Sequence, residues 1–147
     1  MTPTSSATSP RGELLGPAFA QALARRDFAQ VAEVVCPDIE FRALTPRRAW
    51  EAQTAGQTLH VLRTWFDEAT VVDDVLGVRI DAVGDRHCVT YRFAGDRPDG
   101  RFVVEQHAYY AGRDDRIGWM RLLCSGFRPA DQPRTARPPW ATSMSWE

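Results

Sequence analysis

The sequence predicts an α+β fold, in which a cone-shaped, curved antiparallel β-sheet carries the N-terminal helices on its concave face. Up to about residue 67, apolar residues recur at helical spacing, and from Val71 onward they alternate with a period of two. Helices followed by a run of strands are typical of α+β folds, whereas α/β folds alternate the two. A bent sheet roofed by helices encloses a cone, whose interior is a natural cavity for a small molecule.

Before residue 67, the apolar spacing predicts three helical segments and one short strand. The helical segments cover residues 14–26, 27–36 and 45–67, the last with a break near Gly56, and the strand covers residues 39–44. The third segment is placed after Thr45 because threonine followed by proline is typical of a helix N-cap and the first helical position.

Four strands follow, and together they form a meander. They cover residues 71–83, 87–94, 102–111 and 117–127, and the turns between them are rich in Gly, Asp and Arg. The short strand at 39–44 can join this sheet at an edge.

Both ends of the chain are rich in Ser, Thr and Pro, so residues 1–12 and 130–147 are predicted to be disordered tails. Trp140 and Trp146 complicate this prediction for the second tail, since tryptophan rarely sits in fully solvated coil. A single domain over residues 13–129 lies between the tails.

The composition excludes several classes of protein. The formal net charge is −1, whereas proteins that bind nucleic acids or anionic membranes usually carry a basic surplus. No apolar run reaches the roughly 18 residues of a membrane span, and the N-terminus has no apolar signal segment. The three cysteines are widely spaced, as is typical of small core residues in a reducing compartment. We therefore expect a cytoplasmic protein that binds neither nucleic acid nor membrane.

The residue types that are missing also bear on function. All 18 basic residues are arginine, so the chain has neither a Schiff-base lysine nor a P-loop lysine. His60, His87 and His107 are too far apart in the sequence for a local metal-ligand spacing. We expect neither a metal nor a cofactor.

Three segments carry a family resemblance. They are DFAQVAEVVCPDIEF, VGDRHCVTYRF and YYAGRDDRIGWMRLLCSGF. They are similar to the second helix and first strand, the central hairpin and the last hairpin of the nuclear transport factor 2-like superfamily, and within it of the SnoaL-like polyketide cyclases and ketosteroid isomerases. The resemblance covers residues 13–128. It implies a cone-shaped pocket for a hydrophobic small molecule, and a homodimer that forms through the outer face of the sheet.

The functional residues of the ketosteroid isomerases are not all present. In an alignment without gaps, their general-base aspartate falls on Ala43, their oxyanion tyrosine on Phe19 and their oxyanion acid on His107. The base and the tyrosine are therefore missing, and the isomerase mechanism does not carry over as it stands.

A candidate site lies on the strand at 102–111. Glu105, His107 and Tyr109 occupy alternate positions, so their side chains project from one face. The imidazole can exchange a proton near neutral pH, the carboxylate would orient it, and the phenol can hydrogen-bond a carbonyl oxygen as charge develops there. Tyr91 on the neighbouring strand can share the role of the phenol. The apolar walls of the pocket are expected from Phe19, Phe41, Trp65, Met120 and Leu122.

These residues predict a small cofactor-independent enzyme, which transfers a proton in the cyclisation, isomerisation or dehydration of a hydrophobic ketone-like or polyketide-like substrate. The alternative is a non-catalytic module of the same fold that binds a small molecule or forms a dimer. A third possibility is a hydratase or epoxide hydrolase in which Glu105 activates water.

The orientation of the strand at 102–111 decides between these hypotheses. We expect His107 to face the cavity. The opposite face is the more apolar one, which a dimer interface would explain, and it carries Phe102, Val104, Gln106, Ala108 and Tyr110. If that face turns inward instead, Glu105 and His107 are surface residues.

Overall fold

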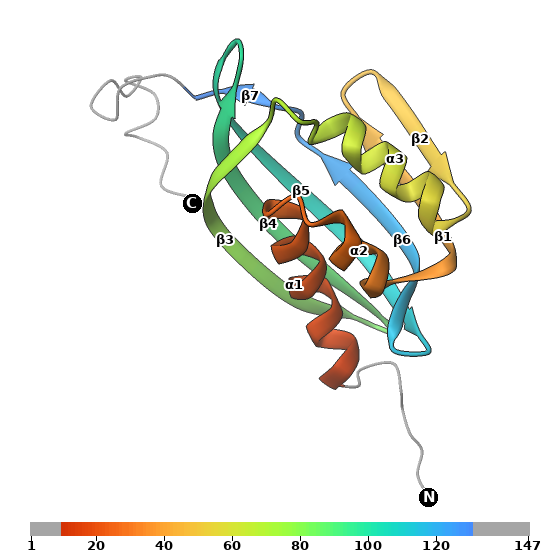
Figure 1. Ribbon diagram of the computed structural model, residues 1–147. Helices are drawn as coiled ribbons and strands as arrows, with labels where there is room; N and C mark the ends of the chain where they lie inside the picture. The colour runs from red at the N-terminus through yellow and green to blue at the C-terminus, as the bar shows by residue number, and fades with distance from the viewer. Residues whose placement is uncertain (1–9, 131–147) are drawn as a thin grey trace, which may run out of the picture.

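The computed structural model describes residues 10–130, which form one curved sheet with three helices on one of its faces (Figure 1). The helices are α1 (Pro10–Ala24), α2 (Phe28–Val34) and α3 (Ala55–Trp65). The strands are β1 (Val35–Thr45), β2 (Arg48–Ala52), β3 (Val71–Val83), β4 (Arg86–Arg97), β5 (Gly100–Arg113), β6 (Arg116–Cys124) and β7 (Arg128–Pro129). The sheet order is β2-β1-β6-β5-β4-β3, and β7 pairs with β5. The predicted α+β cone fold is confirmed.

Most of the two predicted tails, with Trp140 and Trp146, lies outside the described residues. Residues 10–12, which the sequence places in the N-terminal tail, belong to α1. Within the described part of the chain, no helix is long and apolar enough to cross a membrane.

Strands β3 to β6 form the predicted meander, in which each strand is antiparallel to the next. β1, however, runs parallel to β6, so the sheet is mixed and not wholly antiparallel as predicted. Helix α3 carries the chain across the sheet from β2 toward the far edge at β3 (Figure 1). The meander then leads back across the sheet to β1. Its last strand, β6, therefore runs in the same direction as β1.

A strand replaces the first part of the predicted third helix. β2 pairs with β1, and Thr45 lies opposite Arg48. The proline between them is followed by Arg47 at φ 73°, and a proline that precedes a residue of positive φ is typical of a type II turn. The threonine–proline pair is therefore a turn signal here. Helix α3 begins later, where the Thr54 side chain accepts a hydrogen bond from the Gln57 N–H at 3.0 Å.

Tyr110 ties the start of α1 to the sheet. Its hydroxyl accepts a hydrogen bond from the Gly16 N–H at 2.9 Å and donates one to the Gly12 carbonyl at 2.7 Å. A Cβ atom at Gly16 would lie 2.7 Å from the Tyr110 ring, so glycine allows a close approach that no other residue would. The docking of α1 on Tyr110 helps to hold this face of β5 toward the helices.

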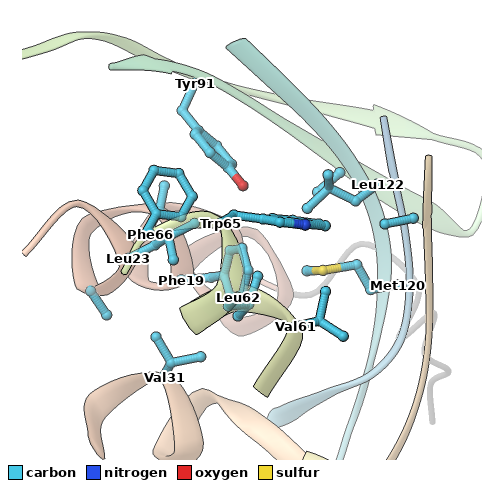
Figure 2. Close-up of a cluster of buried hydrophobic side chains, with 14 of the residues drawn as sticks. Phe19, Leu23, Val31, Val61, Leu62, Trp65, Phe66, Tyr91, Met120 and Leu122 are labelled. Carbon is cyan, nitrogen blue, oxygen red and sulfur yellow. The ribbon is translucent and has the colours of Figure 1, made fainter. Parts of the chain in front are cut away.

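Apolar side chains occupy the space between the helices and the sheet (Figure 2). Aromatic rings contact one another across this core, and the ring centroid of Tyr91 lies 6.4 Å from that of Phe19 and 4.9 Å from that of Phe93. The residues predicted to wall a cavity are all buried in it, namely Phe19, Phe41, Trp65, Met120 and Leu122. The sequence predicts that these side chains surround a cavity, whereas in the structure they belong to the buried core.

Candidate functional site

Strand β5 turns the predicted catalytic face away from the helices. Its buried positions are Phe102, Val104, Gln106, Ala108 and Tyr110. Glu105, His107 and Tyr109 share the other, outer face, so the prediction that they line the cone is wrong. The reason is the hydrophobic effect, because this orientation buries two aromatic rings and keeps the charged side chains in contact with water.

The interior holds a neutral polar pair that sequence reasoning missed. The Tyr91 hydroxyl donates a hydrogen bond to Oε1 of Gln106 at 2.5 Å, and Nε2 of Gln106 donates to Sγ of Cys124 at 3.2 Å. Burial raises the pKa of Tyr91 well above its usual value, so the phenol stays neutral. The position of Gln106 between Val104 and Ala108 in the alternation is the signal that places it inside.

Over residues 12–130, no carboxylate side chain is buried in this interior, where it could act as a general base. Besides the tyrosine hydroxyls, the buried polar side chains of these residues are Thr58, Thr70, His87 and Gln106. The sequence groups Tyr91 with Glu105 and His107. Tyr91 is buried and pairs with Gln106 across β4 and β5, so it lies on the opposite side of the sheet from both.

A hydrogen-bonded chain runs across the outer face from β4 to β5. Oε1 of Glu105 accepts from Nη2 and Nε of Arg92 at 2.6 and 2.9 Å, and Oε2 is hydrogen-bonded to Nε2 of His107 at 2.7 Å. Nδ1 of His107 lies 3.3 Å from Oγ1 of Thr90. Arg92 first, and His107 second, lower the pKa of Glu105, so this carboxylate is ionised at neutral pH. These hydrogen bonds orient the imidazole of His107, a side chain that is 38% exposed.

A groove of about 740 Å³ crosses the outer face over β2, β1, β6 and β5, and we call it the outer groove. Two rows of side chains in register across these strands line it. One row is Tyr109, Arg121, Arg42 and Glu51, and the next is Leu123, Leu44 and Ala49. Ala43, Trp50 and Leu122 complete the lining. His107 pairs with Leu123 across β5 and β6, so the imidazole borders the groove.

The charges of the outer groove are paired. Nε of Arg42 lies 3.1 Å from a carboxylate oxygen of Glu51, and Nη2 of Arg121 lies 2.7 Å from one of Glu40. The arrangement combines an apolar row with a polar row that contains two arginines, next to an oriented acid–imidazole pair. In the described part of the chain, His, Cys, Asp and Glu side chains do not gather in groups of three that could hold a metal.

Comparison with known proteins identifies the fold. The sequence matches no family model and no curated protein. A nuclear transport factor 2-like protein from Burkholderia xenovorans is 15% identical with a TM-score of 0.63, over 82% of this chain and 93% of its own. A polyketide cyclase candidate from Xanthomonas campestris is 15% identical with a TM-score of 0.62, over 77% and 89%. An epoxide hydrolase from Mycobacterium tuberculosis is 18% identical with a TM-score of 0.60, over 78% and 83%.

The chain therefore has the nuclear transport factor 2-like fold, as its sequence predicts. Cyclases and hydrolases are among the proteins that share this architecture. At such low identity the likeness concerns the fold, and the function has to be argued from the residues of this chain.

Proposed function

We propose that this protein is a binding module that holds a hydrophobic small molecule in the outer groove. The observation that carries the proposal is the exposed apolar surface of that groove. Leu44 and Leu123 are each 55% exposed and Tyr109 is 43% exposed, on the sheet face opposite to the three described helices (Figure 1). A volume of about 740 Å³ lies within the range of small-molecule sites, and clustered exposed apolar residues mark binding surfaces.

Replacing Leu44 or Leu123 with glutamate is expected to weaken the binding of Nile red, a neutral apolar dye, roughly tenfold. Each change removes an apolar contact and places a charge where the dye would lie. The dissociation constant is measured by titrating the dye and following its fluorescence. Leu14→Glu is the matched control, because Leu14 is 67% exposed on α1, on the helical side of the sheet.

Equal affinity in the wild type, Leu44→Glu and Leu14→Glu would contradict the proposal. The same face is where the family resemblance places a second copy of the chain, and we propose a homodimer as the competing occupant of the groove. Sedimentation of the same variants separates the two uses. A dimer that Leu44→Glu dissociates, without dye binding in either form, would assign the groove to the second copy.

The second candidate function is the proton-transfer enzyme, acting on a hydrophobic ketone-like or polyketide-like substrate. The hydrogen bonds that join the side chains of Thr90, His107 and Glu105 favour this function, because a general base oriented by a second polar group is a common arrangement in acid–base catalysis. The imidazole borders the outer groove, so a ligand bound there would lie beside it. The substrate would then react on the outer face of the sheet and not inside the cone.

His107→Gln is expected to lower the rate of catalysed proton exchange strongly if this second function is correct. The assay follows deuterium uptake at the α-carbon of 2-tetralone in D₂O by mass spectrometry. Loss of a positioned general base lowers such rates by about 10²-fold or more. His60→Gln is the control, because His60 is exposed on α3. Exchange no faster than in buffer, or equal in wild type and His107→Gln, would exclude this candidate.

A further inference from the structure

We infer that the outer groove selects an amphipathic monocarboxylate, meaning an apolar body that ends in one carboxylate; this inference rests on the proposed function. The two rows that line the groove differ in chemistry. Leu44, Leu123 and Ala49 form the apolar row, and in the adjacent row Arg42 on β1 and Arg121 on β6 occupy paired positions in the strand register. A ligand that spans both rows needs an apolar part and an anionic part.

The arginine side chains of the lining favour an anionic group. The charged side chains that line the groove are Arg42, Arg121 and Glu51, and because Glu40 pairs with Arg121 and Glu51 with Arg42, a ligand carboxylate has to replace one of these partners. Arginine recognises carboxylates through paired N–H donors, which match the two carboxylate oxygens. An apolar cation or a neutral molecule would not form these charged hydrogen bonds with arginine.

The two arginines differ in how firmly they are held. Arg121 is fixed by Glu40 and by the backbone carbonyls of Met120 and Glu40, at 3.0 and 3.3 Å from Nη1. Arg42 pairs with Glu51 through Nε at 3.1 Å, and both side chains are more than half exposed, at 59% and 64%. Exposed ion pairs contribute little to stability, so a ligand carboxylate can replace Glu51 on Arg42 at small cost.

The bound ligand would lie with its carboxylate on Arg42, near the fixed charge of Arg121, and its apolar body over Leu44 and Leu123. The Tyr109 ring closes the end of the arginine row on β5. In this arrangement Glu51 competes with the ligand, so removal of its charge strengthens binding. A merely apolar groove would show no such dependence.

The test compares 2-naphthoate with 2-naphthol, which have the same ring system and differ in charge at neutral pH. Calorimetric titration of the full chain gives the ratio of the two dissociation constants. We expect naphthoate to bind roughly tenfold more tightly than naphthol. The preference should fall toward one in Arg42→Gln and rise in Glu51→Gln. Arg79→Gln is the control, since Arg79 forms a comparable exposed ion pair with Asp81 on β3, at 3.4 Å.

Each outcome is decisive. Equal affinities of the two compounds in the wild type, or a preference that Arg42→Gln leaves intact, would overturn the inference while the proposed binding function stands. A preference lowered equally by Arg79→Gln would reveal a general charge effect and would also overturn it. Failure of both compounds to bind would count against the proposed function itself.

Discussion

Replacing Phe19 with alanine is expected to lower the free energy of unfolding by roughly 3–5 kcal/mol, because the change leaves a cavity in a filled core. Phe19 is fully buried, and its ring packs against that of Tyr91 in the layer between α1 and the sheet (Figure 2). Urea unfolding followed by tryptophan fluorescence measures the loss. The sequence predicts the same residue as a wall of a ligand cavity, so this variant tests whether the cone is filled or hollow.

Leu14→Ala on the same helix provides the comparison, since this side chain is 67% exposed and its truncation should change stability by about 0.5 kcal/mol or less. A hollow cone would behave differently. Phe19→Ala would then cost little, because its ring would face open space and not packed neighbours. That result would return the candidate site to the interior, around Tyr91 and Gln106.

Much of the sheet is predictable because its signals are local. The hairpin between β5 and β6 is an example, since Asp114 and Asp115 both have positive φ, at 57° and 64°, and Asp tolerates this conformation better than most residues. The alternation of Glu105, His107 and Tyr109 is equally local, because it follows from the geometry of a strand. Local signals therefore give the strands, their order in the meander and the side chains that share a face.

The direction in which that face points depends on more than alternation. Both faces of β5 carry a tyrosine, at 109 and 110, but the face with Phe102 and Val104 is the more apolar one, which favours its burial. Tyr110 turns inward because its hydroxyl bonds to Gly12 and Gly16, more than 90 positions earlier in the chain. This contact between distant segments adds to the burial of the more apolar face of β5, and together they turn Glu105, His107 and Tyr109 to the outer face.

The β1–β2 hairpin shows a second limit. Threonine followed by proline fits both a helix start and a type II turn, and the conformation of the next residue decides between them. Arg47 adopts positive φ although arginine gains nothing from it locally. Pairing of β2 with β1 compensates for this strain, and it also supplies Ala49 and Glu51 to the outer groove. The groove therefore depends on a strand that the sequence pattern assigns to a helix.

Raising the pH from 10 to 12 is expected to remove roughly 2 kcal/mol of stability through Tyr110 alone. Burial raises the pKa of Tyr110 from 10.0 to about 12 in the folded protein. A folded-state pKa above the unfolded one means that the contribution is fully present below pH 10 and is lost as the pH rises through 12. The measurement is the free energy of unfolding in urea at pH 8, 10, 11 and 12, for the wild type and for Tyr110→Phe.

Below pH 10, the wild type should exceed Tyr110→Phe in stability by about 1–3 kcal/mol, since phenylalanine leaves the Gly16 N–H and the Gly12 carbonyl without the hydroxyl. The gap should narrow above pH 10, because phenylalanine has no proton to lose. A gap that stays constant up to pH 12 would mean that the hydroxyl remains in contact with water. The docking of α1 on Tyr110 would then contribute little to the orientation of β5, and the outward placement of His107 would depend on the burial of the apolar face alone.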